Sequence, residues 1–261
     1  MLGRLFGKGS KPEDQTGSSA GGPTQRAVIG LCFNFQRGLI YESEYFFDVG
    51  MKAIFDTLKE LRLRATFHCP AKLCEIAPDH LAAIAEAGHE IAILGFSDES
   101  PSELTDEAIR QLVFSCRSAF ARRGYHPVGF RSPHSQTDAR LCEELARQHF
   151  LYNSEHDHAK HPYVLVPGSP PLVRIPIYTD DRGLRRREET YDATVSKHLR
   201  VLRKALQNRR FASIVFHPWI LAEDMQRMEH WQSWVRAAVK EGARVCALED
   251  ALKEYDLVAP V

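Results

Sequence analysis

The sequence predicts an α/β fold consisting of a single distorted (β/α) barrel of about seven to eight parallel strands. From Arg26 onward, short apolar runs alternate with amphipathic helical stretches, which is typical of parallel sheets whose crossovers are helices. The length of 261 residues fits one such barrel. Nearly every apolar run ends in or near a polar or ionisable residue, as expected where strands meet at a barrel mouth. These observations favour a barrel over a doubly wound sheet.

Each element follows from a local pattern. Strands are expected at 27–35, 65–69, 90–94, 128–131, 150–154, 172–178, 213–217 and 244–248. Helices are expected at 45–61, 79–87, 105–122, 138–148, 192–208, 225–240 and 249–255. Thr105 suits a helix N-cap, and Gly88 and Gly124 are suited to end helices. The stretch between Ser154 and Leu172 shows neither the helical nor the strand periodicity of apolar residues, so we expect it to be irregular.

The first 25 residues differ in composition from the rest. They are rich in Gly, Ser, Pro and other polar residues, so we expect residues 1–25 to form a disordered tail. The barrel domain is then expected to span residues 26–261.

The amino-acid composition limits the classes of binding partner that we expect. Lys and Arg together number 34, as do Asp and Glu, and this balance gives no reason to expect a nucleic-acid partner. No apolar run reaches 18 residues, so no transmembrane helix is expected. The six cysteines form no C-x-x-C pair and most sit in apolar runs, which predicts buried, reduced thiols and a cytoplasmic location. No oligomeric state follows from the sequence.

The polar residues at the strand ends form one set. In chain order they are Asn34, Gln36, His68, Asp98, Arg131, Asn153, Tyr178, Asp180 and His217. A single residue of this kind is usually a solvated loop residue. A whole set at the carboxyl ends of parallel strands predicts a polar pocket at the barrel mouth. Trp219, just after the last of them, is a candidate for stacking against a sugar ring.

Six separate stretches carry a family resemblance: YESEYFFDVG, LRLRATFHCP, AGHEIAILGFSDESPSEL, PVGFRSPHS, FLYNSEHDH and IVFHPW. In order and spacing they resemble the NodB-homology polysaccharide deacetylases, in particular the peptidoglycan-deacetylase-like and allantoinase-like branch. The likeness runs from about Ala27 to Tyr255. It implies a distorted (β/α) barrel that hydrolyses an N-acyl or related C–N bond with a divalent metal held by one aspartate and two histidines.

The resemblance places the metal chemistry at positions that are changed here. The two acidic residues of the family's first motif correspond to FNFQ, with Asn34 and Gln36 at or near them. The two histidines after GHEI correspond to Leu94 and Asp98. Leucine has no lone pair, amide oxygens are poor zinc ligands, and a catalytic zinc normally has three protein ligands. The sequence therefore predicts no metal at the usual position and no cofactor.

Other positions of the family pattern are retained. Arg131 in GFRSP matches the arginine that the family uses beside its base, and His217 in VFHPW matches the histidine that assists as general acid. We expect Asp98 to pair with Arg131 or His217 where a metal would have neutralised charge. The candidate catalytic residues are thus His217, Arg131, Asn34 and Asp98, and the candidate ligand contacts are Gln36, His68, Asn153, Tyr178 and Trp219.

Three functions stay open. The first is an inactive or strongly altered family member that binds a glycan or small molecule at the barrel mouth. The second is a metal-independent amide or ureide hydrolase that uses His217 and Arg131. Zinc activation of water is worth up to about 12 kcal/mol, whereas a general base supplies about 3–5 kcal/mol, which weighs against the second. The third is a deacetylase whose zinc or other divalent metal moved to His156, His158 and His161.

Overall fold

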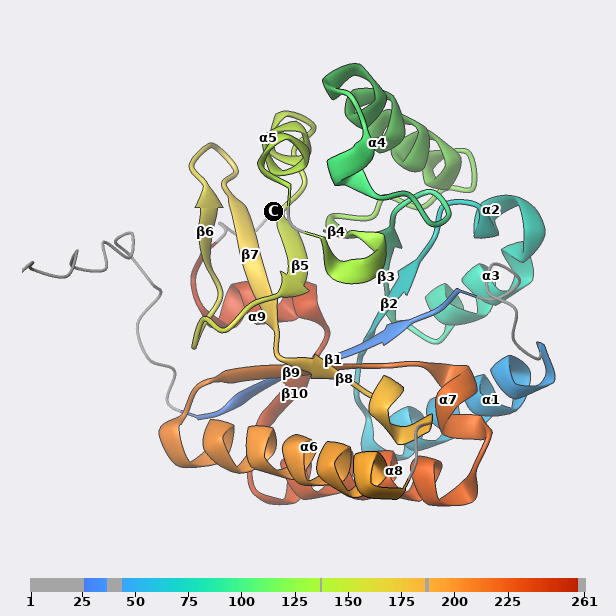
Figure 1. Cartoon of the computed structure of the whole chain (residues 1–261), viewed down its shortest axis with the longest axis vertical. Helices are drawn as coiled ribbons and strands as arrows, with labels where there is room; N and C mark the ends of the chain where they lie inside the picture. The colour runs from blue at the N-terminus through green and yellow to red at the C-terminus, as the bar shows by residue number, and fades with distance from the viewer. Residues whose placement is uncertain (1–25, 37–43, 137, 186–187, 258–261) are drawn as a thin grey trace, which may run out of the picture.

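The computed structural model describes residues 26–36, 44–136, 138–185 and 188–257, and the tail predicted at residues 1–25 lies outside them. In this part of the chain, ten strands form one sheet in the order β6-β7-β5-β4-β3-β2-β1-β9-β8, with β10 beside β1. Their bounds are β1 Val28–Asn34, β2 Thr66–Cys69, β3 Glu90–Leu94, β4 Gly129–Arg131, β5 Tyr152–His156, β6 Tyr163–Val166, β7 Leu172–Ile177, β8 Thr179–Asp180, β9 Phe211–Phe216 and β10 Arg244–Cys246. The sheet curls into a half-barrel (Figure 1), which confirms the predicted fold class.

Two short strands were not expected from the sequence. β6 pairs antiparallel with β7 inside the stretch predicted to be irregular, and β8 continues the chain after β7 and pairs with β9. The other pairings of the sheet are parallel, as predicted.

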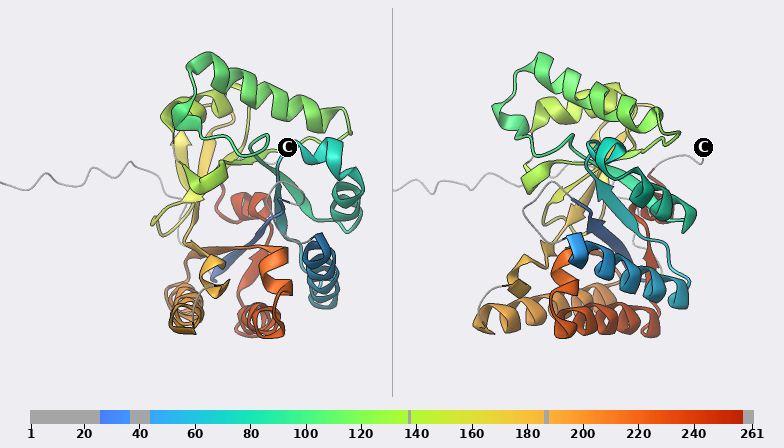
Figure 2. Two further views of the ribbon diagram at one scale, coloured as in Figure 1. Left: turned by 45° about the vertical axis from the view of Figure 1, so that its right-hand side comes forward. Right: turned by 90° about the vertical axis from the view of Figure 1, so that its right-hand side faces the viewer.

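The helices of the described residues are α1 Glu44–Leu61, α2 Leu73–Ile76, α3 Pro78–Glu86, α4 Asp106–Ala121, α5 Ala139–Arg147, α6 Glu188–Asn208, α7 Pro218–Ala222, α8 Met225–Lys240 and α9 Leu248–Glu254. Thr105 caps α4 by accepting a hydrogen bond from the backbone N–H of Ala108. Gly88 and Gly124 adopt φ values of +77° and +80°, the left-handed conformation that ends helices most readily at glycine. Figure 2 shows the helices around the outside of the curled sheet, where α6 and α8 are in contact.

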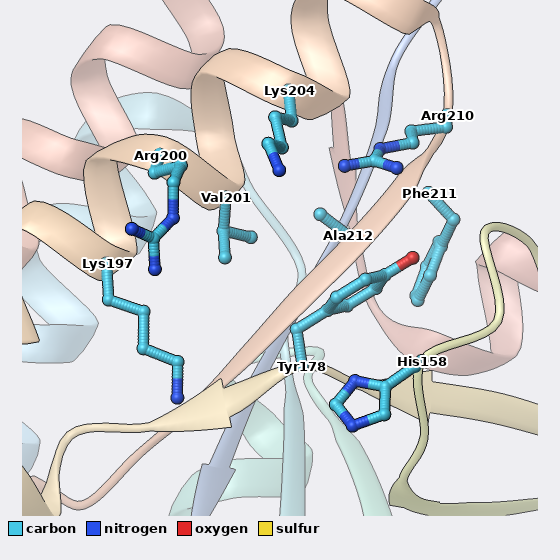
Figure 3. A pocket seen from close by; sticks show the side chains of 9 residues that line it. All are labelled: His158, Tyr178, Lys197, Arg200, Val201, Lys204, Arg210, Phe211 and Ala212. Carbon is cyan, nitrogen blue, oxygen red and sulfur yellow. The ribbon is translucent and has the colours of Figure 1, made fainter.

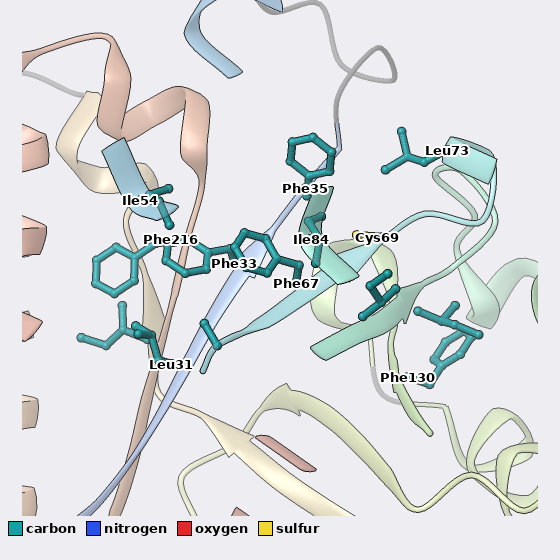
Figure 4. Close-up of a cluster of buried hydrophobic side chains, with 14 of the residues drawn as sticks. Leu31, Phe33, Phe35, Ile54, Phe67, Cys69, Leu73, Ile84, Phe130 and Phe216 are labelled. Atoms are coloured by element: carbon teal, nitrogen blue, oxygen red, sulfur yellow. The ribbon is translucent and has the colours of Figure 1, made fainter. Parts of the chain in front are cut away.

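Strand alternation divides the core into two layers. On β1, Leu31 and Phe33 face the helices, and Phe33 stacks on Phe67 with ring centroids 4.9 Å apart (Figure 4). Val28 and Cys32 face the barrel interior. Because successive side chains of a strand point to opposite faces, the next interior position on β1 is Asn34, at the end of the strand.

All six cysteines are buried and free, as the sequence predicts. Within the described ranges, no helix has both the length and the apolar character that crossing a membrane requires.

The amino ends of the strands enclose a carboxyl group. Glu90, 4% exposed, accepts hydrogen bonds from the hydroxyls of Thr66 and Tyr152 and from the backbone N–H of Glu249. Burial raises the pKa of Glu90 to about 7, and the charge of Glu249 adds to this shift. The folded protein therefore holds a proton at Glu90 that the unfolded chain has already released near pH 4.5.

The substitution Glu90→Gln is expected to remove this pH dependence. As pH rises from about 4.5 to 7, Glu90 ionises in the unfolded chain while the folded state keeps its proton. This stabilises the unfolded state, so the wild type loses up to about 3 kcal/mol of its free energy of unfolding. Urea denaturation over this pH range is expected to show the wild type losing stability relative to E90Q by that amount. The exposed Glu86→Gln variant is the control and should follow the wild type. A constant difference between wild type and E90Q at every pH would contradict the assignment.

Candidate functional site at the barrel mouth

The carboxyl ends of the strands bring most of the predicted catalytic set together. Asn34 is in register with His68 on β2, and Leu94 on β3 is in register with Arg131 on β4. His217 directly follows Phe216, the register partner of Phe33, and so lies next to Asn34 across the β1–β9 pair. Asn34, His68, Arg131 and His217 are all buried. We call these four residues the mouth cluster.

His217 is held by a carboxylate that the sequence analysis did not select. Oδ1 of Asp181 lies 2.6 Å from Nδ1 of His217, and Oδ2 accepts the backbone N–H of His217 at 2.8 Å. Both side chains are almost completely buried. Burial raises the pKa of Asp181, and the adjacent His217 opposes that shift. In the neutral imidazole, an Nδ1–H that donates to Asp181 leaves the lone pair on the other ring nitrogen, Nε2, which has no hydrogen-bond partner in the described chain.

Arg131 and His68 meet at Ser154 on β5. The Arg131 guanidinium donates to the Ser154 carbonyl at 2.9 Å and to the Ser135 hydroxyl. Nε2 of His68 lies 2.9 Å from the Ser154 hydroxyl. Burial, and secondarily the charge of Arg131, keep the pKa of His68 well below its usual value, so the ring is neutral. Ser154 is a second site residue that the sequence analysis missed.

Asn153 points away from this cluster. Since Ser154 faces Arg131 and His68, its neighbour Asn153 is on the opposite face of β5. There its amide nitrogen donates to the Phe130 carbonyl and to Glu155, both at 3.2 Å. Glu155 in turn accepts the backbone N–H of Ser132, so this network fixes the loop that follows β4.

The remaining predicted ligand contacts are divided between two places. Trp219 on α7 is buried and its ring lies edge-on to that of His217, with centroids 6.0 Å apart. The guanidinium of Arg185 lies 4.5 Å over the Trp219 ring. Gln36 is buried two residues beyond Asn34. Tyr178, between β7 and β8, instead lines a separate pocket near the beginning of β9.

Asp98 takes a different partner from the one expected. Its side chain is 63% exposed and lies 3.0 Å from Nε2 of His134. Arg131 binds Ser154 and Ser135, and His217 binds Asp181. The predicted pair of Asp98 with Arg131 or His217 is therefore corrected to an exposed pair with His134.

The residues at the mouth do not fit the metal that the family resemblance implies. Leu94 offers only a hydrocarbon side chain, Asn34 offers a neutral amide, and Asp98 lies at the surface beside His134. The alternative histidines have separate neighbours, since His156 lies by the Ile177 carbonyl and His161 by the Tyr255 hydroxyl. Across the described ranges, no group of three or more His, Cys, Asp or Glu side chains is placed to hold a metal ion.

The family model for polysaccharide deacetylases matches residues 22–152, half of the chain. The protein therefore belongs to the polysaccharide deacetylase family. A peptidoglycan deacetylase-like protein of Gibberella zeae is 30% identical over 109 residues. That match covers 41% of this chain and 32% of the relative, so the chain spans about a third of the relative's length.

Solved structures share the fold at low sequence identity. A protein of Mycobacterium smegmatis assigned to the polysaccharide deacetylases has a TM-score of 0.80 at 20% identity, covering 93% of this chain and 95% of that one. An allantoinase has a TM-score of 0.76 at 16% identity, with coverages of 97% and 99%. A carbohydrate esterase CE4 family pseudoenzyme from Bacillus anthracis has a TM-score of 0.63 at 15% identity, with coverages of 90% and 68%. These structures share the barrel architecture.

Proposed function

We propose that this protein is a polysaccharide deacetylase-like protein without the family's standard metal site, and that it binds a glycan-type ligand at the barrel mouth. The observation that carries the proposal is a set of buried polar atoms at the mouth with no hydrogen-bond partner in the described chain. They are Asn34 Oδ1, Arg131 Nε and His217 Nε2. Buried polar atoms are rarely left unpaired, because each costs about 1–3 kcal/mol of desolvation. A ligand rich in hydroxyl and amide groups supplies both donors and acceptors for such a set.

Two further observations support this reading. The donor set at the family's metal position consists of a hydrocarbon, neutral amides and an exposed carboxylate, so metal-dependent deacetylation has no structural basis there. The six free and buried thiols support a reducing compartment, and we propose the cytoplasm as the place of action.

The His217–Asp181 pair favours one alternative, metal-independent hydrolysis of an amide or ureide. In that reaction Nε2 of His217 takes a proton from the attacking water and later returns it to the leaving nitrogen. Asp181 stabilises the imidazolium, and the Arg131 guanidinium polarises the carbonyl group. A general base supplies about 3–5 kcal/mol against the roughly 12 kcal/mol that a metal contributes, so the binding function is the stronger candidate.

The substitution Asn34→Leu separates ligand binding from stability. Leu has a similar volume and removes an amide oxygen that is unpaired in the free protein, so the free energy of unfolding is expected to stay level or rise slightly. Calorimetric titration with an N-acetylglucosamine tetramer is expected to show one site in the wild type and roughly tenfold weaker binding in N34L. His134→Gln, at the exposed pair with Asp98, is the matched control.

The same titration distinguishes the two functions. If the protein binds without turnover, His217→Gln changes the affinity for the tetramer and no acetate is released by either protein. If the wild type releases acetate and H217Q does not, metal-independent hydrolysis would become the leading function. Absence of tetramer binding to the wild type would contradict a glycan as the ligand.

A further inference from the structure

A second cavity lies well away from the mouth cluster, against α6 and the beginning of β9 (Figure 3). Its volume is about 280 Å³, and Phe211 and Ala212 line it where β9 starts. His217 follows the other end of the same strand, six residues beyond Phe211. At about 3.3 Å per residue, this separates the two sites by roughly 20 Å. The cavity is therefore distinct from the barrel mouth.

Four cations line this cavity. Lys197, Arg200 and Lys204 come from α6 at a spacing of three and four residues, which puts them on one face of the helix. Figure 3 shows these side chains extending from the same side of α6, and Arg210 approaches from the start of β9. Among the residues that the structure describes, no acidic side chain lines the cavity.

In the described chain, none of these four cations forms an ion pair with a carboxylate, whereas Arg64, Arg227 and Arg244 each do. Asp157 is the acidic residue next to the lining residue His158, and its carboxylate has other partners. It accepts from the Tyr163 hydroxyl and from the backbone N–H of Ala159, both at 2.8 Å. Within the described residues the positive charge of the cavity is therefore not neutralised, and an anionic ligand would neutralise it.

The facing wall is aromatic. The rings of Tyr178 and Phe211 lie there beside the imidazole of His158 (Figure 3). The Tyr178 hydroxyl donates to the Ala159 carbonyl, which fixes the ring, and burial raises the pKa of Tyr178 to about 12, so the hydroxyl is uncharged at neutral pH. The cavity thus combines cations on one side with neutral aromatic surface on the other.

We propose that this cavity binds a small, soluble organic phosphate that carries at least two negative charges. Guanidinium groups bind phosphoryl oxygens through paired N–H donors, and the lysines add point charges. The organic part of the ligand packs against Tyr178 and Phe211. Small-molecule pockets run from about 300 to 1,000 Å³, so a cavity just below this range suits a compact ligand rather than a polymer. This site is independent of the function proposed for the barrel mouth.

The test is calorimetric titration of the full chain with inorganic pyrophosphate and with phenyl phosphate, at constant ionic strength. One saturable site is expected for each probe. Arg200→Gln and Arg210→Gln are each expected to weaken binding roughly tenfold or more, because each removes a charge-assisted hydrogen-bond donor. Arg203→Gln is the matched control, since Arg203 is exposed on the same helix and does not line the cavity. Lys197→Gln, at an exposed position, provides a second cavity variant should R210Q unfold.

Each outcome decides the proposal. An equal loss of affinity in R203Q and R200Q would show that the probes bind a general basic surface, and this would overturn the proposal. The absence of saturable binding by either probe would also overturn it. Inorganic phosphate, titrated under the same conditions, is the reference for the aromatic wall, and phenyl phosphate that binds no more tightly than it would overturn the role of that wall. Binding to vesicles containing phosphatidate, without binding of the soluble probes, would assign the surface to a membrane and overturn the small-molecule proposal.

Discussion

Replacing Asn34 by Asp, Leu94 by His and Asp98 by His is expected to create a zinc site where the natural chain lacks the ligands for one. Asn34 is buried at the interior end of β1, and Leu94 ends β3 in register with Arg131. Asp98 lies four residues after Leu94 on the loop that leaves the same strand. The triple variant supplies one carboxylate and two imidazoles, which are suitable zinc ligands, and leaves one coordination position open.

Calorimetric titration with zinc measures whether the triple variant has gained a metal site. The triple variant is expected to bind one ion per chain with a dissociation constant of about micromolar or tighter, roughly −8 kcal/mol. The single variant Asp98→His, which leaves Leu94 and Asn34 in place, is the control and should bind no more tightly than the wild type. A triple variant that folds and still fails to bind zinc would mean that the backbone, and not only the side chains, departs from the family's metal site.

Asp181→Asn is expected to reverse the tautomer of His217. In the wild type, the two carboxylate oxygens accept from Nδ1–H and from the backbone N–H of His217. An asparagine must keep its oxygen on the backbone N–H, so its NH₂ group faces Nδ1 and the ring proton moves to Nε2. The lone pair that faced the mouth is then lost. Under the hydrolase alternative, turnover is expected to fall by about 10⁴-fold, as when the equivalent carboxylate of a catalytic triad is replaced.

Nitrogen-15 spectra of the imidazole rings report this change directly, whether or not the protein turns over a substrate. The wild type is expected to show His217 protonated at Nδ1, and D181N protonated at Nε2. The control is Asp180→Asn, which changes a neighbouring carboxylate that does not contact His217. This variant should keep the wild-type tautomer. An unchanged tautomer in D181N would contradict the proposed role of Asp181.

Parallel topology is what made the mouth cluster predictable. Asn34, His68, Arg131 and His217 each follow or end an apolar run, and the carboxyl ends of parallel strands share one side of the sheet. Their convergence therefore needed only the correct strand assignment. The same reasoning could not choose between Asn153 and Ser154, because the run FLYNS does not alternate and one residue of register reverses the face.

Asp181 was missed for a different reason. The run LVRIPIY gives no sign that β7 ends at Ile177 and that a new strand, β8, then pairs with β9. Because β8 pairs with β9, the residue that follows β8, Asp181, lies next to His217 at the end of β9. The Asp180–Asp181 doublet was the available signal, since β8 ends at Asp180 and the second carboxylate follows directly after it.

The loop carrying Asp98 and the cation-lined cavity both depend on tertiary structure. His134 lies 36 residues from Asp98, and its backbone has φ of +59°, which the sequence pattern PHS does not predict. The spacing of Lys197, Arg200 and Lys204 marks one face of a helix, and a charged helix face is usually solvated. Only the approach of Arg210, Tyr178 and His158 turns this face into the wall of a cavity.

The most direct test of the central claim is calorimetric titration of the unmodified, tag-free protein with zinc, cobalt and manganese. The changes at all four positions of the family's metal chemistry, Asn34, Gln36, Leu94 and Asp98, predict no stoichiometric binding tighter than about micromolar. One tightly bound ion per chain, lost when a histidine among His156, His158 and His161 is replaced, would contradict the account and restore a metal-dependent deacetylase as the leading function.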